Sequence, residues 1–156
     1  MVTTSTQVRP LRRDDYAPWR ELFDGYNAFY GRSGDTRLPE EVVQMSWSRF
    51  FDYYEPMHAL VAERDGVIVG ITHFLYHRST ISLGPVCYLQ DLFTVETARG
   101  SGVGRALIEA VYARAHAAGA SRVYWQTHES NTVAMRLYDQ LAEKSGFLVY
   151  RHLFAA

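Results

Sequence analysis

The most constraining feature of the sequence is an apolar strand joined to an amphipathic helix by a glycine-rich turn. Residues 85–95, PVCYLQDLFTV, are largely apolar, which is typical of a central strand. The turn ARGSGVGRAL follows, and Val103, Leu107, Ala110 and Val111 then recur on one face of a helix. The first N–H groups of such a helix are unpaired and its dipole favours an anion, so the turn predicts a phosphate-binding site.

Two known phosphate-binding patterns do not fit this turn. The mononucleotide loop needs Gly-Lys-Ser or Gly-Lys-Thr, and neither occurs in the chain. The dinucleotide fingerprint needs glycine at its sixth position, but counting from Gly100 or Gly102 gives Arg105 or Leu107. A dinucleotide-binding fold also needs several more strand–helix units, and only 52 residues follow Gly104. A nicotinamide-binding domain is therefore kept only as an alternative.

The segment before the turn predicts a short strand, two helices and a hairpin. The alternating stretch QVRPLR predicts the strand, and helices are expected over residues 16–30 and 40–54. Asp65 and Gly66 separate two β-prone runs, which is a strong hairpin signal.

The segment after the turn predicts two more strands and one more helix. Gly119 is expected to end the first helix, and SRVYWQTHE is expected to form a strand. Asn131 is placed to cap the next helix, and GFLVYRHLF predicts the last strand. The predicted order is β-α-α-β-β-β-α-β-α-β, a mixed α/β domain over residues 1–156.

Composition narrows the possible functions. The net charge of −1 at pH 7 does not point to nucleic acid or an anionic membrane as a partner. No apolar run approaches the roughly 20 residues of a membrane helix, and residues 1–15 lack the apolar stretch of a signal peptide. The single cysteine, Cys87, excludes an internal disulfide and fits a reducing compartment. We therefore expect a soluble cytoplasmic protein.

Two spaced motifs resemble those of a known family. Residues 99–104 fit the pattern [RQ]-x-x-G-x-[GA], and residues 131–147, NTVAMRLYDQLAEKSGF, are similar to N-x-x-A-x-x-L-Y…G-F. With these motifs, the chain resembles the GNAT superfamily of N-acetyltransferases over nearly its whole length. The resemblance implies a GNAT fold, with a central twisted mixed sheet of about six to seven strands and about four helices.

The resemblance implies that acetyl-CoA is the cosubstrate. His73 and His77 are four positions apart but have no cysteine or acidic partner at ligand spacing, so no metal site is expected. In the family the glycine turn holds the pyrophosphate, the preceding strand holds the pantetheine arm, and strand N–H groups serve as oxyanion donors. Asn131 matches a position that contacts the cofactor arm, although a plain helix cap explains it equally well. The expected cofactor-binding residues are Leu92, Phe93, Thr94, Arg99, Gly100, Ser101, Gly102, Val103, Gly104, Arg105 and Asn131.

Two residues are the expected catalytic groups. Tyr138 matches the family tyrosine that protonates the departing sulfur, and a phenol remains protonated at pH 7 and can donate. Its alternative role is a half-buried packing aromatic. Asp91 is the candidate base or ammonium-binding group, with a structural ion pair or loop cap as the alternative. Gln90 stands where the family often has glutamate, and it and Asp91 face opposite sides of a strand unless a bulge intervenes.

Within the family, YLQDLFTVETARGSGVG looks most like the polyamine and small-amine acetyltransferases, such as the spermidine/spermine, thialysine and yeast polyamine/histone enzymes. This implies direct attack by a primary amine of a polyamine, a lysine-like compound or an amino acid, and a homodimer. A non-catalytic CoA-binding module and an enzyme acting on a protein amine remain alternatives. The candidate acceptor-binding residues, which ordinary packing also explains, are Tyr26, Tyr30, Gln90, Trp125 and His128.

Overall fold

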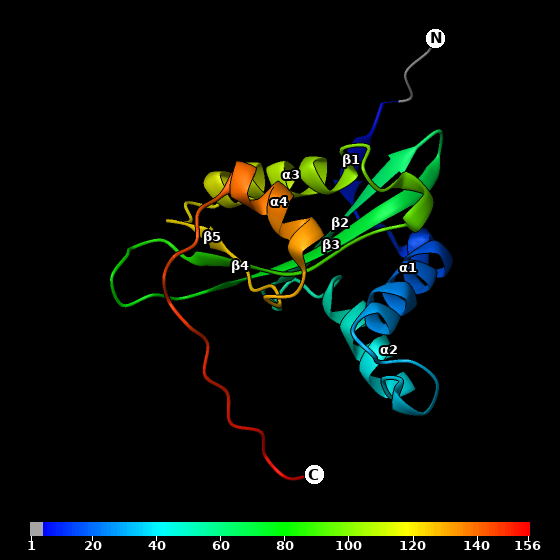
Figure 1. The fold of residues 1–156 in the computed structure, drawn as a ribbon, viewed down its shortest axis with the longest axis horizontal. Coiled ribbons are helices and arrows are strands. Elements are labelled where there is room, and N and C mark those ends of the chain that lie inside the picture. The colour runs from blue at the N-terminus through cyan, green and yellow to red at the C-terminus, as the bar shows by residue number, and fades with distance from the viewer. Residues whose placement is uncertain (1–4) are drawn as a thin grey trace. The chain divides into compact units, whose positions relative to one another are not determined.

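The computed structural model describes residues 5–156 and divides the chain into two compact units. The first unit ends at Gln126 and the second covers Thr127–Ala156. The elements of the first unit are β1 (Gln7–Pro10), η1 (Arg13–Asp15), α1 (Tyr16–Phe29), η2 (Gly34–Thr36), α2 (Glu40–Arg49), β2 (Met57–Arg64), β3 (Val67–His77), β4 (Val86–Thr94), η3 (Glu96–Ala98), α3 (Val103–Ala117) and β5 (Val123–Tyr124) (Figure 1). The second unit contains α4 (Thr132–Leu141).

The first unit is built on a mixed sheet with strand order β1-β2-β3-β4-β5. All neighbouring strands are antiparallel except β4 and β5, which are parallel. The predicted hairpin joins β2 and β3, where Asp65 and Gly66 have φ values of 50° and 76°. Two consecutive positive φ angles are those of a type I′ turn, whose twist matches that of the strands it joins. The mixed α/β fold class is thus confirmed.

The helices of the first unit cover opposite faces of the sheet. On β3, Gly70 faces α3, and a Cβ atom there would lie 2.7 Å from Val103 Cγ1. His73, three residues along, faces α1 and contacts Trp19. Side chains an odd number of positions apart on a strand point to opposite faces, so α3 and α1 lie on opposite sides (Figure 1).

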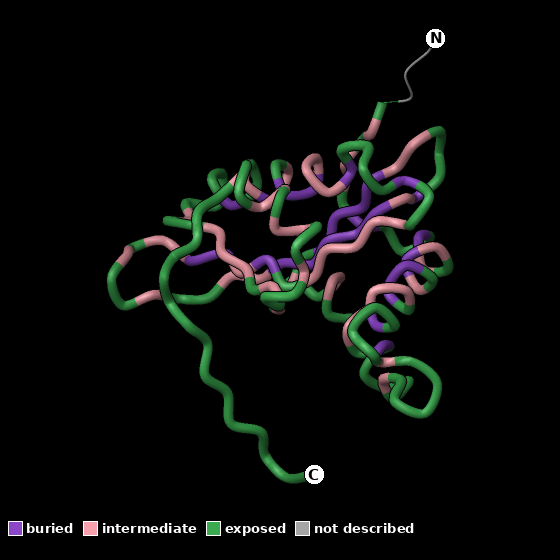
Figure 2. The backbone as a smooth tube through the Cα atoms, in the orientation of Figure 1, coloured by how far each residue is buried: buried purple, intermediate pink, exposed green. Residues whose placement is uncertain are grey.

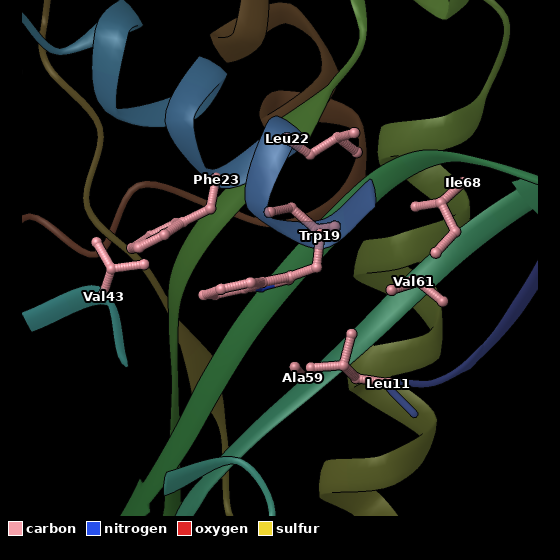
Figure 3. Close-up of a cluster of buried hydrophobic side chains, with 9 residues drawn as sticks. Leu11, Trp19, Leu22, Phe23, Val43, Ala59, Val61 and Ile68 are labelled. Carbon is pink, nitrogen blue, oxygen red and sulfur yellow. The ribbon is translucent and has the colours of Figure 1, made fainter. Parts of the chain in front are cut away.

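The core on the α1 face is rich in aromatic side chains. Trp19 is fully buried and stacks on Phe23 with ring centroids 5.0 Å apart. Val61 and Ala59 of β2 lie beneath them (Figure 3). This packing fixes α1 against the centre of the sheet.

The predicted last strand does not form. Residues 147–154 have no regular structure, and Phe147 and Phe154 are each 90% exposed (Figure 2). A strand needs a second strand to pair its backbone, and none of the strands described within residues 5–156 pairs with this segment. The sheet formed by the described residues therefore has five strands, fewer than the six to seven expected.

Two other elements are shorter than predicted. The helix expected to reach residue 54 ends at Arg49, and the strand expected at SRVYWQTHE is paired only at Val123 and Tyr124. The helix that follows Asn131 ends at Leu141, where the backbone becomes extended. No described helix has the length and apolar character needed to cross a membrane.

Candidate functional site

A β-bulge in β4 decides which of two neighbouring polar residues faces α1. Asp91 pairs with His73 while Leu89 pairs with Phe74, so Gln90 is the extra residue. On a regular strand, Asp91 would share the face of Leu89, which is the α3 face, and Gln90 would face α1. The bulge reverses this alternation, and Asp91 instead shares the α1 face with His73.

Two backbone hydrogen bonds support this reversal. The Cys87 N–H donates to Arg122 O on the β5 side, and the Val95 N–H donates to Val69 O on the β3 side. These two residues are an even number of positions apart, so on an unbroken strand their N–H groups would point the same way. The bulge between them therefore turns the backbone as well as the side chains.

A hydrogen-bonded chain of three side chains runs from the core to Asp91. The Trp19 indole N–H donates to His73 Nε2 over 2.9 Å, and His73 Nδ1 lies 2.8 Å from Asp91 Oδ2. Trp19 and His73 are buried, whereas the Asp91 side chain is 13% exposed. His73 and Trp19 were missed as site residues because they lie 18 and 72 positions from Asp91 and belong to no motif.

Tyr26 of α1 and Tyr30, which directly follows that helix, complete the surroundings of Asp91. The Tyr26 hydroxyl is hydrogen-bonded to Asp91, and burial together with the Asp91 charge raises the pKa of Tyr26 far above its ordinary value. The pKa of Tyr30 is also raised, by burial and then by the Asp91 charge, while the Arg32 charge lowers it. Both phenols therefore stay protonated, and Tyr26 donates to the carboxylate.

Arg32 lies next to the two tyrosines. Its guanidinium carbon is 5.7 Å from the Tyr26 ring centroid and 5.5 Å from that of Tyr30, and its Nε donates to Asn27 Oδ1 over 2.7 Å. Within residues 5–156, no carboxylate lies at ion-pair distance from Arg32. A cavity of about 210 Å³ opens beside it, between α1, η2 and α2, and its other charged lining residues are Arg20, Arg37 and Asp24. Tyr26 thus interacts with both the Asp91 carboxylate and the Arg32 cation.

The β5 side of β4 is open beyond the bulge. β5 pairs only with Cys87 and Tyr88, and no other described strand adjoins β4 on that side. Because the Val95 N–H points to β3, alternation turns the N–H groups of Leu92 and Thr94 to the open edge. The Phe93 N–H points to β3 and its ring lies against Gly25, so Phe93 contributes packing and offers no N–H at this edge.

The glycine turn has the backbone of an anion-binding helix start. Gly100 and Gly102 have φ values of 73° and 90°, where a side chain would be strained. The first helical hydrogen bond runs from Ala106 N–H to Gly102 O, so the N–H groups of Val103, Gly104 and Arg105 precede the helical ladder. The Val103 side chain is buried, so this residue can offer a ligand only its backbone.

Side chains around the turn hold it in place. Arg64 at the end of β2 donates from Nη1 to Ser101 Oγ over 2.8 Å and from Nη2 to Ser101 O over 2.7 Å. The Ser101 hydroxyl in turn donates to Ala98 O. Arg99 donates from Nε to Thr94 O over 3.0 Å. Arg64 is a residue that the motif did not reveal, because it lies outside the turn in sequence.

Arg99 and Arg105 differ in how they are engaged. The Arg99 guanidinium lies 5.5 Å from the Phe93 ring centroid, so it folds back over β4. Arg105 Nη1 is 3.9 Å from Glu109 Oε1, one helical turn along α3.

In the second unit, Tyr138 belongs to α4 and Asn131 directly precedes that helix. Asn131 is at the N-cap position, but its side chain makes no cap bond and instead donates to Thr127 Oγ1 over 3.3 Å. The cap interpretation of its side chain is therefore wrong. Tyr138 is half-buried in the last part of α4. His128 is exposed, and its Nδ1 accepts from the Ser130 N–H over 3.1 Å.

Trp125 does not join the aromatic residues near Asp91, contrary to the expectation that it lines one amine site with Tyr26 and Tyr30. Its ring centroid lies 6.4 Å from that of Tyr112 on α3, whereas Tyr26 belongs to α1 on the opposite face and Tyr30 directly follows that helix. Within residues 5–156, no three His, Cys, Asp or Glu side chains are grouped so that they could hold a metal ion.

Comparison with known proteins identifies the family. The sequence profile of the Acetyltransferase (GNAT) family matches residues 19–142. D-amino-acid N-acetyltransferase HPA3 of Saccharomyces cerevisiae is 33% identical over 153 residues, which cover 97% of this chain and 92% of the yeast protein. Thialysine N-epsilon-acetyltransferase of Mus musculus is 26% identical over 162 residues, which cover 94% and 92% of the two chains.

Solved structures agree on the fold. The structure of AAC(6')-Iy in complex with a bisubstrate analog superimposes with a TM-score of 0.81 at 17% identity, over 97% of this chain and all of that one. A probable acetyltransferase superimposes with a TM-score of 0.82 at 22% identity, over 96% and 99% of the two chains. The chain therefore belongs to the GNAT family of acetyltransferases.

Proposed function

We propose that this GNAT acetyltransferase moves the acetyl group of acetyl-CoA to the primary amine of a small amino acid-like acceptor. The observation that carries the proposal is the placement of Asp91 on the α1 face, beside Tyr26 and Tyr30, the two tyrosines that Arg32 contacts. A carboxylate with only hydrogen-bonding partners attracts an ammonium group more strongly than one already paired with a cationic side chain.

The donor half of the site follows from the backbone. We assign the pyrophosphate of acetyl-CoA to the start of α3, where the N–H groups of Val103, Gly104 and Arg105 and the helix dipole favour an anion. The pantetheine arm is assigned to the open edge of β4, where the N–H groups of Leu92 and Thr94 point outward.

The chemistry then proceeds by direct attack in a ternary complex. The acceptor arrives as an ammonium, since an alkyl amine of the lysine type has a pKa near ~10.4, and it must lose a proton before attack. Asp91 binds the ammonium and takes this proton, directly or through a water molecule. Whichever of the outward Leu92 and Thr94 N–H groups is not bonded to the pantetheine arm stabilises the oxyanion, and Tyr138 gives its phenolic proton to the departing thiolate.

The acceptor is proposed to carry a carboxylate. A guanidinium binds a carboxylate through charge-assisted hydrogen bonds, and Arg32 has no acidic partner within the described residues. A polyamine would instead meet this cation with a like charge. The printed name of the yeast relative, a D-amino-acid N-acetyltransferase, agrees with an amino acid as the acceptor.

A homodimer is proposed on separate grounds. The C-terminal segment exposes six large apolar side chains, and a second copy of the chain would give them a partner. These residues are Phe147, Leu148, Val149, Tyr150, Leu153 and Phe154. Size-exclusion chromatography with light scattering tests this, and a monomer at micromolar concentration would contradict it.

An acceptor panel tests the enzyme. Thiol release from acetyl-CoA is measured with D- and L-lysine, D- and L-phenylalanine, the matching amines without a carboxylate (cadaverine and phenethylamine), spermidine and a peptide amine. We expect the amino acids to exceed their decarboxylated partners in kcat/KM. Binding of CoA without acceptor-dependent thiol release would support a CoA-binding module, and preference for the peptide would support a protein substrate.

Arg32→Gln sharpens this test. Loss of a charge-assisted hydrogen bond costs roughly 1.5–3 kcal/mol, so KM for the amino acid should rise about 10- to 100-fold while KM for the decarboxylated amine changes little. Arg13→Gln is a matched control, because Arg13 also stacks on an aromatic ring, that of Phe51 at 4.7 Å, but not near Asp91. Equal effects of Arg32→Gln on both acceptors would refute the carboxylate assignment.

A further inference from the structure

The proton on the His73 ring can be placed from its two hydrogen bonds. An indole N–H can only donate, so His73 Nε2, which lies 2.9 Å from Trp19 Nε1, must accept with its lone pair. The ring proton of neutral His73 is therefore on Nδ1, where it is donated to Asp91 Oδ2 over 2.8 Å. Trp19 thereby selects one tautomer of His73.

The surroundings of His73 leave this arrangement undisturbed by other charges. The imidazole is packed between aromatic rings, with centroid distances of 4.7 Å to Phe50 and 5.4 Å to Phe23. Its neighbour on β2 is Ala59, and its only charged contact among the described residues is Asp91 on β4. The titratable groups on this side are Tyr26 of α1 and Tyr30, which directly follows α1, and both act on Asp91 rather than on the imidazole.

A second proton on His73 would conflict with Trp19. It would have to sit on Nε2, where it would face the indole N–H, and two donors cannot share a hydrogen bond. The ring is buried, so water cannot replace the indole as its partner. The Trp19 N–H therefore opposes a proton on Nε2 as well as selecting one tautomer.

We propose that Trp19 is a positioning residue for acetyl transfer. It acts through His73 to keep Asp91 a carboxylate that has hydrogen-bond donors but no cationic partner and that faces the acceptor. The inference rests on the proposed role of Asp91 in binding the acceptor. With neutral His73, the Asp91 charge is oriented by donors and stays available to an ammonium. With protonated His73, Asp91 would be half of a buried ion pair and would attract the acceptor less.

The role also restricts where the proton of the acceptor goes. His73 already carries a proton on Nδ1 and cannot receive another there, so no relay from Asp91 into the core exists. The proton taken from the ammonium by a carboxylate oxygen of Asp91 must leave through the exposed side of that group. His73 thus differs from a histidine that would act as a general base itself.

Nitrogen NMR of the histidine side chains tests the first step in the unaltered protein. With ¹⁵N-labelled imidazoles, His73 should show a protonated Nδ1 and an unprotonated Nε2 from pH 6 to 8, with or without acetyl-CoA. The imidazole signals of His73 are assigned as those that disappear in the His73→Asn variant. A protonated Nε2 would overturn the inference, whatever the activity of the enzyme proves to be.

Variants test the consequence for turnover. Trp19→Phe removes the N–H and keeps an aromatic ring, so the acid limb of the pH profile of kcat/KM should move to higher pH by about half a unit or more. Trp47→Phe is the matched control, because Trp47 packs in the same cluster, 5.0 Å from the Trp19 ring, without bonding His73. It should lower stability while leaving the pH profile in place.

Adding His73→Asn to Trp19→Phe provides the rescue. The Asn amide can still donate to Asp91 but cannot take a proton, so the acid limb should return to its original position. A Trp19→Phe enzyme that is folded by circular dichroism and has the original profile would overturn the inference, as would a failure of the double variant to restore it. If the unaltered protein acetylates nothing, the proposed function fails instead, and the NMR result still decides the His73 tautomer.

Discussion

Replacing Gly70 with alanine tests how α3, and with it the glycine turn, is positioned. A Cβ atom at residue 70 would lie 2.7 Å from Val103 Cγ1, 3.0 Å from Leu107 Cδ1 and 3.3 Å from Phe93 O. Val103 and Leu107 are buried to 1% and 0% exposure, so neither side chain can turn into solvent. The new methyl group therefore has to push the first turns of α3 away from β3.

The contact distances set the size of the effect. Carbon atoms pack best at about 3.5–4.0 Å, so the two closest contacts are too short by about 0.5–0.8 Å or more. Forcing a methyl group into a packed core costs about 1–3 kcal/mol, and the lower unfolded-state entropy of alanine offsets up to about 1 kcal/mol of this. A net loss of about 1–2 kcal/mol lowers Tm by about 2–8 °C for a chain of this length.

Stability and cofactor kinetics are measured on the same variants. Urea unfolding gives the loss of stability, and KM for acetyl-CoA should rise because the first N–H groups of α3 are displaced. Val103→Ala removes the nearest clashing atom, so the double variant should be more stable than the sum of the single effects predicts, by about 1 kcal/mol. The rescue is partial, since the Leu107 contact persists.

Gly66→Ala is the control for this cycle. Gly66 has a φ of 76°, and a Cβ atom added there would have no other atom within 4 Å, so its replacement strains the hairpin without touching α3. It should lower stability and leave KM for acetyl-CoA unchanged. Its effect on the free energy of unfolding should simply add to that of Val103→Ala. Additive behaviour of Gly70→Ala with Val103→Ala, or an unchanged KM, would refute the argument that this contact positions the turn.

Three further predictions concern single residues. Tyr138→Phe should lower kcat about 100-fold or more while calorimetry shows unchanged CoA binding, and turnover at the original rate would contradict its role as the acid. Arg64→Met removes two hydrogen bonds to Ser101, so KM for acetyl-CoA should rise about 5- to 10-fold with kcat nearly unchanged; an unaltered KM would refute this. Burial raises the pKa of Cys87 to about 11, so its thiol should resist a disulfide reagent at pH 8 until urea unfolds the protein. Because the folded state holds this proton more tightly than the unfolded chain, stability should fall as the pH rises from about 9 towards 11.

Local signals in the sequence were sufficient for most of the fold. The hairpin at Asp65 and Gly66 and the helix start at Gly102 depend on positive φ angles, which glycine adopts at no cost and which therefore leave a mark on the sequence. The apolar run of β4 and the helical periodicity of α3 likewise predicted a strand and a helix from the sequence. The last strand was not, because the pattern FLVYRHLF shows that a segment is suited to a strand but not that a second strand is available to pair with it.

The candidate site likewise has one part that a local motif predicts and one part that depends on tertiary structure. The donor half was predicted from one contiguous motif, because a helix start binds an anion with its own backbone. The acceptor half depends on the tertiary structure. A bulge at Gln90, which no residue type in the sequence indicates, turns Asp91 to the α1 face. The packing of α1 then brings Trp19 to His73.

The sequence by itself thus determined the fold class and the position of the glycine turn, which rest on short-range backbone preferences, while two spaced motifs indicated the family. Only the tertiary structure decided which polar residue of β4 faces α1, and that Trp125 lies on the other side of the sheet. The physical reason is that a one-residue change of register reverses every side chain beyond it. Burial, charge and hydrogen-bond partners, which make Asp91 a candidate acceptor site, are set only after that register is chosen.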